Sequence, residues 1–383
     1  MESHLYRAKQ AITRRRAIGL LAAFLPGSLP SVACEEKRSE RWVAAQGDKA
    51  GSYGVGWVAP AQVAPASAAL TGFRGHDVLQ HPLRKNSVLV IARRPGTRGL
   101  EIDLLSGREV SGFSCATDRH LFGHACFSAD GRVLYTTESA ISEGLGRIAV
   151  RDAASYQLLD EWSSHGIGPH ELRLMPDGLS LAVANSGILT RPASGRRGLN
   201  LASMRSNVSY LSAANGGLED AFELAEPKAS LRHLAVAADG SVAFAIQMQR
   251  DAAGHTNTVP LAGVHRLGSP PQLFDDPPTL IDQLKDYVGS VAICDQSRTA
   301  GFTSPRGSLA AFWNIDTGML VGAHALRDVC GIASTPGRAG FLLSSSLGEI
   351  RELDSFCLQE YRAKRVKLPG QRWDNHLHVV VDV

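Results

Sequence analysis

The chain has 383 residues, of which 44% are hydrophobic and 20% are charged, and its 40 Lys and Arg residues nearly balance its 37 Asp and Glu residues. This composition is that of an ordinary globular protein and excludes collagen, a coiled-coil rod and wholesale disorder. The net charge is only +3 and the basic runs are short and isolated. No nucleic-acid partner is expected, because a DNA or RNA footprint needs clustered excess Lys and Arg.

The N-terminal residues have the order of an export signal. A basic segment with Arg14, Arg15 and Arg16 precedes the apolar residues 17–25, and small residues follow at 31–33. This order predicts a signal peptide over residues 1–33, a flexible linker over 34–40 and a periplasmic location. The apolar run is about half of the roughly 20 residues that a membrane-spanning helix needs. The mature chain is therefore expected to have no transmembrane helix.

The three arginines also resemble a twin-arginine signal, although the Phe-Leu pair that often follows such arginines is missing. Cys34 allows two interpretations: a lipid anchor on the first mature residue, or plain cleavage after Ala33. Ser31 stands where a lipoprotein signal usually has Leu. The six cysteines are widely spaced without a Cys-x-x-Cys pair, which argues against a zinc knuckle and permits one or two disulfides in the periplasm.

From residue 70 onward the chain repeats a short apolar strand, a turn and a second apolar strand. The clearest copies are residues 125–131, 172–178 and 234–240, and each ends in an Asp-Gly turn, in which Gly accepts the required positive φ. A third strand and often a fourth follow. Four strands per unit, at a period of roughly 40–60 residues, indicate a β-propeller. The sequence predicts an all-β fold, with one seven-bladed propeller of four-stranded antiparallel blades over residues 41–383.

The predicted blades start near residues 76, 124, 170, 233, 290, 330 and 376. The last start leaves room for one strand, so residues 377–381 are expected to form the innermost strand of blade seven. Residues 41–46 and 55–59 would supply its outer strands, because closing the ring removes exposed sheet edges. A short helix is expected over residues 280–287, with Thr279 as its N-cap.

Histidine recurs at the start of the predicted blades, although the chain has only 13 histidines. The residues in this column are His76, His124, His170, His233, Ser290, Cys330 and His376. Because the first strand of a propeller blade lines the central channel, we expect five imidazoles around one mouth of the channel, with Cys330 extending the arc. The structural Gly-His of WD-type propellers lies several residues further upstream, and no Trp-Asp ends the third strands here.

Such a column favours a transition-metal or metal-cofactor site, since neutral imidazole suits Cu, Fe, Zn and Ni and thiolate favours softer ions. A structural polar ring and a catalytic acid/base role are the alternatives. Neighbouring carboxylates could orient the rings, and arginines just upstream of blade starts could bind an anionic group such as a haem propionate. A carboxylated chelate is a second anionic group that the arginines could bind. The residues concerned are Asp77, Glu171, Asp374, Arg232, Arg327 and Arg372. For the arginines, structural salt bridges are the alternative.

Two insertions interrupt the repeat. Residues 191–209, in blade three, are basic because of Arg191, Arg196, Arg197 and Arg205. They form either a solvated loop or a flap that contacts an anion over the same face as the histidines. Residues 249–260 form a smaller insertion of the same kind.

Several phrases together resemble an exported bacterial family of unknown function, the domain-of-unknown-function family numbered 1513. They are residues 166–172, 183–188, 199–201 and 231–235, and the resemblance covers most of residues 70–383. Arg191 stands where the family usually has His. The family consists of seven-bladed propellers with twin-arginine signals, encoded beside imelysin-like iron-regulated proteins and di-haem peroxidase-like proteins. The resemblance implies a role in iron or other metal acquisition and supplies no reaction.

Three functions fit these observations. The first is a periplasmic, monomeric accessory protein that handles iron, copper or haem through the histidine column. The second is a docking scaffold for an imelysin-like or di-haem peroxidase-like partner. The third is a redox or lyase-type enzyme, since propellers host such activities at the same mouth. The imidazole-rich column argues against a lactonase-type Ca²⁺ site, which uses mostly carboxylate and Asn ligands. No Gly-x-Ser-x-Gly or P-loop motif is present.

Overall fold

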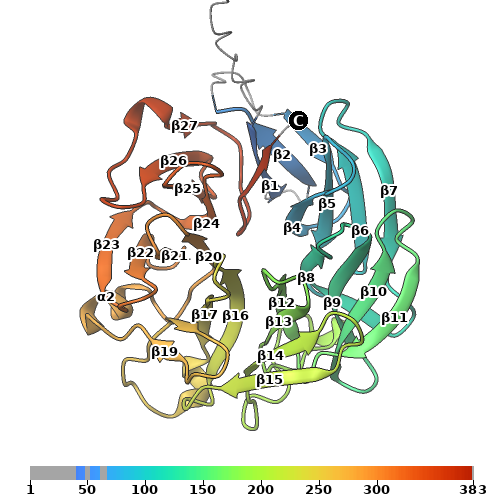
Figure 1. The fold of residues 1–383 in the computed structure, drawn as a ribbon, viewed down its shortest axis with the longest axis horizontal. Coiled ribbons are helices and arrows are strands. Elements are labelled where there is room, and N and C mark those ends of the chain that lie inside the picture. Colours follow the sequence, from blue (N-terminus) through green and yellow to red (C-terminus); the bar gives the residue numbers. More distant parts are fainter. Residues whose placement is uncertain (1–39, 48–51, 61–66, 382–383) are drawn as a thin grey trace, which may run out of the picture. The chain divides into compact units, whose positions relative to one another are not determined.

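A computed structural model describes residues 40–47, 52–60 and 67–381. These residues form seven four-stranded antiparallel sheets arranged in a ring (Figure 1), which confirms the predicted seven-bladed β-propeller. The predicted signal peptide and Cys34 lie outside the described residues. Glu40, predicted as the last linker residue, already belongs to the first strand. Within the described part of the chain, no helix is long and apolar enough to cross a membrane.

Six blades follow the chain in order, each with its first strand nearest the centre. Blades one and two consist of β4 (Gly75–Gln80), β5 (Ser87–Ala92), β6 (Arg98–Asp103), β7 (Glu109–Ser114), β8 (Arg119–Phe127), β9 (Val133–Ala140), β10 (Leu145–Asp152) and β11 (Leu158–Ser163). Blades three and four consist of β12 (Pro169–Leu174), β13 (Ser180–Asn185), β14 (Asn207–Ser212), β15 (Leu218–Glu223), β16 (Ala229–Val236), β17 (Val242–Met248), β18 (Ala262–His265) and β19 (Gln272–Leu273). Blades five and six consist of β20 (Ser290–Cys294), β21 (Thr299–Ser304), β22 (Leu309–Asn314), β23 (Leu320–Ala325), β24 (Val329–Ser334), β25 (Gly340–Ser345), β26 (Glu349–Asp354) and β27 (Val366–Lys367).

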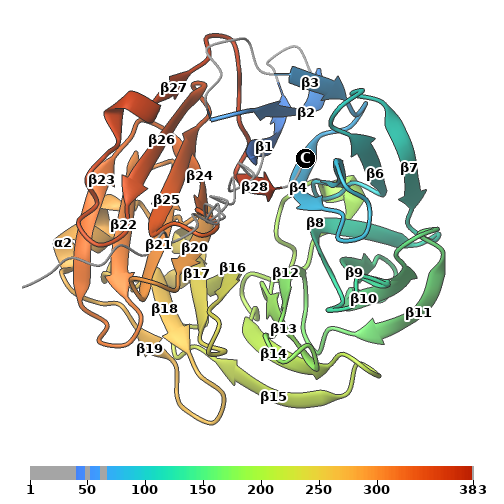
Figure 2. The same cartoon turned by 45° about the horizontal axis from the view of Figure 1, so that its top comes forward.

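Blade seven joins the two ends of the described chain, as predicted. Its strands, from the centre outward, are β28 (His378–Val381), β1 (Glu40–Gly47), β2 (Tyr53–Val58) and β3 (Ser67–Leu70). Figure 2 shows β28 beside β1, between blades six and one. The pairing is antiparallel, with Trp42 opposite Val379 and Arg41 opposite Val380. Val380 and Trp42 are fully buried, so the closing strand completes the apolar core as well as the sheet.

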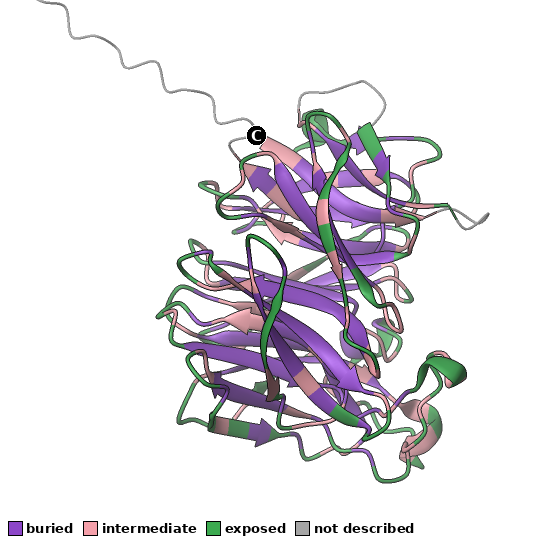
Figure 3. Cartoon of the chain, turned by 90° about the vertical axis from the view of Figure 1, so that its right-hand side faces the viewer, coloured by how far each residue is buried: buried purple, intermediate pink, exposed green. Residues whose placement is uncertain are grey.

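The core lies between the faces of neighbouring blades. Figure 3 shows buried residues along the strands and exposed residues in the connecting loops. The largest apolar cluster joins blades three, four and five. At its rim Trp313 of β22 stacks on Phe274, with ring centroids 5.6 Å apart, and its Nε1 donates to the carbonyl of Asp276. Burial of large apolar side chains between adjacent sheets is the main stabilising contribution in such a fold.

The three Asp-Gly turns that revealed the repeat have the predicted backbone conformation. Gly131, Gly178 and Gly240 all have φ between +71° and +84°. Glycine is favoured there because a side chain would strain this backbone region.

A short helix is present where the sequence predicts one over residues 280–287, but it begins two residues earlier and ends at Gln283. The helix α2 covers Pro278–Gln283 and its N-cap residue is Pro277, not Thr279. Proline fits the first helical position because its ring fixes a helical φ and its missing N–H is not needed there. Within the described residues, the other helical segments are one-turn elements: α1 (Arg250–Ala253), η1 (Pro192–Ser194) and η2 (Arg362–Lys364).

Candidate metal centre

β-Bulges at the start of the innermost strands position the residues of the histidine column. The pairing register shifts between Gly75 and Asp77 in β4, and between Pro169 and Glu171 in β12. His76 and His170 are therefore the extra residues. A bulge changes the direction of side chains, so that two successive residues can both point toward the interior of the ring.

The same register corrects the sequence alignment in two blades. In β16 the shift falls between Leu231 and His233, so Arg232 corresponds to His76, and His233 corresponds to Asp77. In β8 the shift spans the residues between Leu121 and Ala125, and His124 lies well inside the strand rather than at its start. The rings of His124 and His233 nevertheless lie in contact with each other, although the two residues occupy different positions along their strands.

The five histidines form a compact cluster, hereafter the histidine cluster: His76, His124, His170, His233 and His376. Contacting rings have centroids between 4.7 and 6.2 Å apart. Four of the five are buried, and only His170 is partly exposed. The sequence predicts five imidazoles around one mouth of the channel. The structure instead packs the five imidazoles against one another as a mostly buried cluster.

Three of these rings are held at one nitrogen and free at the other. Nδ1 of His124 lies 3.1 Å from Oδ2 of Asp77, and Nδ1 of His233 lies 2.8 Å from Oε2 of Glu171. Nδ1 of His376 lies 3.2 Å from Oγ of Ser290. In all three rings Nε2 is buried without a hydrogen-bond partner. A carboxylate that accepts the Nδ1 proton fixes the tautomer and leaves a lone pair on Nε2, as in histidines that bind metal ions.

Two groups of three histidines could hold a metal ion. One consists of His76, His124 and His376, and the other of His124, His170 and His233. The ligand atoms within each group lie within 4.8 Å of one another. Imidazole nitrogens bind such ions at about 2.1 Å, so two ligand atoms of one ion lie at most about 4.2 Å apart. Small inward movements of the rings would bring each group within that limit. His124 belongs to both groups, so both cannot be filled independently.

The surroundings of His76, His170, His233 and His376 favour the neutral form of these four rings. Burial, with the neighbouring His376 and Arg93, lowers the pKa of His76 well below its usual value. Burial likewise lowers the pKa of His170 and His376, and it lowers that of His233 to about 4 even though Glu171 opposes the shift. Neutral imidazole is the form that binds metal, so no proton has to be displaced from these rings at neutral pH.

The carboxylates behind the rings are ionised. Burial alone would raise the pKa of Asp77, but His378 and His124 outweigh it and hold that pKa well below its usual value. Nε2 of His378 lies 2.7 Å from Oδ1 of Asp77. Glu171 has a similarly lowered pKa, because Arg173 and His124 outweigh the effect of burial. The cluster therefore has two buried anions on its outer side, which favour a cation at its centre.

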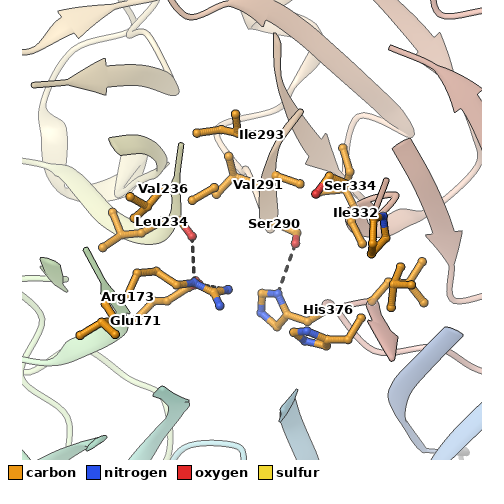
Figure 4. Close-up of a pocket in the computed structure, with 18 residues that line it drawn as sticks. Glu171, Arg173, Leu234, Val236, Ser290, Val291, Ile293, Ile332, Ser334 and His376 are labelled. Atoms are coloured by element: carbon orange, nitrogen blue, oxygen red, sulfur yellow. Dashed lines mark hydrogen bonds and ion pairs between the residues drawn. The ribbon is translucent and has the colours of Figure 1, made fainter. Parts of the chain in front are cut away.

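The cluster borders two cavities. The first, about 410 Å³, is lined by the innermost strands of blades three to seven and adjoins His376. Figure 4 shows His376 with its ring toward Ser290, and Arg173 beside Glu171 and Leu234. The second, about 320 Å³, is lined by His76, His170 and His233 together with five arginines.

The structure places the other predicted site residues in different surroundings. Cys330 lies outside both histidine groups, and its Sγ lies 3.3 Å from the carbonyl of Asp374 and 3.5 Å from that of Trp373. Burial raises the pKa of this thiol, and in the structure its S–H donates to these backbone carbonyls. The described cysteines, Cys115, Cys126, Cys294, Cys330 and Cys357, are all free thiols.

The three arginines predicted to bind an anion lie in different surroundings, and so does Asp374, which is predicted to orient a ring. Arg232 is buried and lines the second cavity. Arg327 and Arg372 are exposed, and Arg372 lines a separate hollow beside Cys330. Asp374 orients none of the clustered rings. It forms ion pairs with Arg74 and Arg93, at 2.9 and 2.7 Å.

Sequence reasoning missed several residues around the cluster. The sequence predicts His378 only as part of a strand, whereas its Nε2 lies 2.7 Å from Oδ1 of Asp77 and makes it the second partner of that carboxylate. Three arginines of the second cavity, Arg93, Arg94 and Arg306, lie in the connections between the second and third strands of blades one and five. Arg196, by contrast, belongs to the basic insertion of blade three, for which the sequence offers an anion-contacting flap as one interpretation, and it does line this cavity. A signal was available, since in an antiparallel blade these connections lie at the same end as the start of the first strand.

Gly123 makes room for the cluster, and its replacement by Ala should disturb it. Its φ is +114°, and an added Cβ would lie 2.5 Å from Cδ2 of His76. We expect Gly123→Ala to cost about 1–3 kcal/mol from backbone strain and also to displace His76. Gly268→Ala is the matched control, because Gly268 has φ +76° with nothing near its added Cβ. Equal thermal midpoints and equal metal affinities for the two variants would contradict this packing role.

The lowered histidine pKa values predict an acid-sensitive metal-free protein. The unfolded chain binds protons below pH 6.5, whereas folded His233 binds one only near pH 4. Stability should therefore fall as the pH drops from about 6.5 toward 4, by up to about 1.4 kcal/mol per pH unit for each such histidine. The carboxylates contribute only at lower pH, because their pKa values are lowered. Thermal midpoints at pH 7, 6 and 5 measure the slope, and a flat profile over this window would refute the prediction.

The comparisons with known proteins agree with this fold. No curated protein matches the sequence. Among solved structures, hydrazine synthase from Kuenenia stuttgartiensis is similar with a TM-score of 0.60 and 11% identity, over 79% of this chain and 89% of that chain. At this identity the likeness concerns the fold alone. The family described as "Protein of unknown function (DUF1513)" matches residues 69–380, which include all seven inner strands up to Val380. The chain therefore belongs to the DUF1513 family, as the sequence phrases predicted.

Proposed function

We propose that this protein is a periplasmic metal-handling accessory protein of iron or copper acquisition, which binds a transition-metal ion through the histidine cluster. The observation that carries the proposal is the set of buried Nε2 atoms without partners on His124, His233 and His376, each on a ring whose Nδ1 is already held. Leaving a buried polar atom unpaired costs free energy, which a metal ion would recover.

The donor set supports a bare ion rather than haem. Imidazole rings that contact one another at centroid distances of 4.7 Å would have to separate before a flat macrocycle could lie between them. All-imidazole sites suit Cu(II), Zn, Fe and Ni, and affinity rises toward copper in that series. With Cys330 outside the cluster, the donor set offers no thiolate that would favour Cu(I).

Metal analysis of protein exported and purified without a His tag or chelator tests the proposal. We expect about one equivalent of iron, copper or zinc per chain, or stoichiometric uptake of the added ion by apoprotein. His124→Asn should abolish stoichiometric binding, because His124 belongs to both groups. His165→Asn, in an exposed loop outside the cluster, is the matched control. A circular-dichroism spectrum and thermal midpoint would show that both variants fold.

Two other outcomes would change the assignment. Protein that contains no metal and fails to bind added Fe, Cu, Zn or haem would contradict a metal centre and favour a docking scaffold for an imelysin-like or di-haem peroxidase-like partner. Turnover of a substrate that depends on the bound ion would instead favour a redox or lyase-type enzyme.

A further inference from the structure

The cavity that adjoins His76, His170 and His233 has an unusual charge, and we call it the arginine cavity. Its other lining residues are Arg93, Arg94, Phe122, Arg196, Arg232, Gln247, Gln249, Tyr287, Arg306 and Asn375. Five guanidinium groups thus line a space of about 320 Å³, and no Asp or Glu is among the lining residues.

Two of these arginines bury guanidinium atoms without a partner. Arg232 is 6% exposed and its Nε has no hydrogen-bond partner. Nη1 of Arg94 is also buried and unpaired, and this guanidinium lies 5.4 Å from the ring of Phe122. Buried charges in proteins are normally paired, because desolvation without compensation is costly. The unpaired groups therefore point to a ligand rather than to a finished structural contact.

The surrounding carboxylates do not neutralise the cavity. Asp374 pairs with Arg93, which accounts for one of the five charges. Among the described residues, no carboxylate forms an ion pair with Arg94, Arg196, Arg232 or Arg306. Burial, together with neighbouring arginines, lowers the pKa of Arg94 to about 9, and burial with the nearby Arg93 lowers that of Arg232 to about 10. Both groups stay protonated at neutral pH, so they face one another as uncompensated cations.

We infer that the arginine cavity binds a small multivalent anion whose charge is carried on carboxylate or phosphate oxygens. Arg232 and Arg94 would contact it from the innermost strand of blade four and from blade one. Arg196, from the basic insertion of blade three, and Arg306, over the ring of Tyr287, would contact it from the other sides. Guanidinium groups suit such ligands, since their planar donors match two oxygens at once.

The size and the neutral lining limit the ligand. A space of about 320 Å³ is at the small end of ligand pockets. The side chains of Gln247, Gln249 and Asn375 add neutral hydrogen-bonding groups that can select among anions. The anion would lie against the proposed metal ligands His76, His170 and His233. The metal ion and an anion that chelates it could therefore bind together as one complex. Binding of the anion itself does not depend on the proposed metal site.

Isothermal titration of metal-free protein with citrate, inorganic phosphate and acetate tests this inference. We expect citrate or phosphate to bind at least ten-fold more tightly than acetate, and to raise the thermal midpoint with concentration. Tighter binding of citrate identifies a carboxylate ligand, and tighter binding of phosphate identifies a phosphate ligand. If neither binds more tightly than acetate, the inference is wrong. A positive result in protein that binds no metal would separate this site from the proposed function.

Substitutions distinguish a binding role from a structural one. Arg232→Gln and Arg94→Gln should each weaken anion binding at least ten-fold while leaving the thermal midpoint of the anion-free protein unchanged or higher, because each removes an unpaired buried charge. Arg327→Gln, at an exposed position outside the cavity, should leave binding unchanged. Variants that lose stability but keep the wild-type affinity would show that these arginines only support the fold, and would overturn the inference.

Discussion

Replacing Asp77 with Asn should weaken metal binding by about 10- to 100-fold without changing its stoichiometry. The carboxylate lies 3.1 Å from Nδ1 of His124 and 2.7 Å from Nε2 of His378. It therefore holds His124 in the tautomer whose free Nε2 faces the cluster. An amide has nearly the same shape, but its NH₂ group can donate to Nδ1 and stabilise the tautomer that cannot bind metal. Competition against a chromophoric chelator measures the affinity.

Two further variants show whether orientation of the ring is the cause. Glu171→Gln should have a comparable effect through His233, whose Nδ1 lies 2.8 Å from this carboxylate. Asp130→Asn, in the exposed turn that follows the innermost strand of blade two, removes the same charge outside the cluster and should leave the affinity unchanged. If Asp77→Asn binds metal as tightly as the wild type while His124→Asn does not, the carboxylate is only a structural partner of His378.

Removing the closing strand should have the largest effect on stability. A chain that ends at His376 lacks β28, so β1 loses the four antiparallel pairs that run from Glu40↔Val381 to Val43↔His378. The buried strand β1 then becomes an edge in the channel, and unpaired edges with apolar residues promote aggregation. We expect this truncated protein to be insoluble or to lack a cooperative thermal transition.

A single substitution tests the same closure in a protein that still folds. Val380 is fully buried in the apolar cluster of blades seven and one. Val380→Ala should lower the free energy of unfolding by about 2 kcal/mol, from two lost methyl groups and the space they leave. Leu347→Ala, at a 48% exposed position in blade six, should change it by less than about 0.5 kcal/mol. Equal stability of the two variants would contradict the importance of the closing strand.

The proposed anion site and the proposed metal site adjoin each other at the histidine cluster. His76, His170 and His233 line the arginine cavity, whereas His376 adjoins the first cavity, which has a volume of about 410 Å³. An ion held by these rings would therefore be approached from two directions, one strongly cationic and one lined mainly by apolar strand residues and the pair of Glu171 and Arg173. The cationic side favours arrival of the ion as an anionic complex, because free cations are repelled there.

The fold and most of the candidate ligands could be predicted from local patterns in the sequence. The Asp-Gly turns at Gly131, Gly178 and Gly240 and the alternating strands are local patterns, because turn φ angles and side-chain alternation depend on adjacent residues. Repetition of these patterns indicated seven blades, and the recurring histidine indicated the residues that meet in the channel. The closing strand followed from the need to remove sheet edges.

How these residues meet depends on contacts between strands and blades that are far apart in the chain. The bulge in β16 places Arg232, not His233, in register with His76, and pairing shifts of this kind depend on the partner strand rather than on the sequence of one strand. For the same reason the sequence does not show where the thiol of Cys330 points. This residue belongs to the histidine column, but its S–H donates to the carbonyls of Trp373 and Asp374. The arginine cavity combines arginines from blades one, three, four and five, which lie close together although they are far apart in the chain. Such contacts exist only after the ring has closed, because closure alone brings the connections of separate blades to one place.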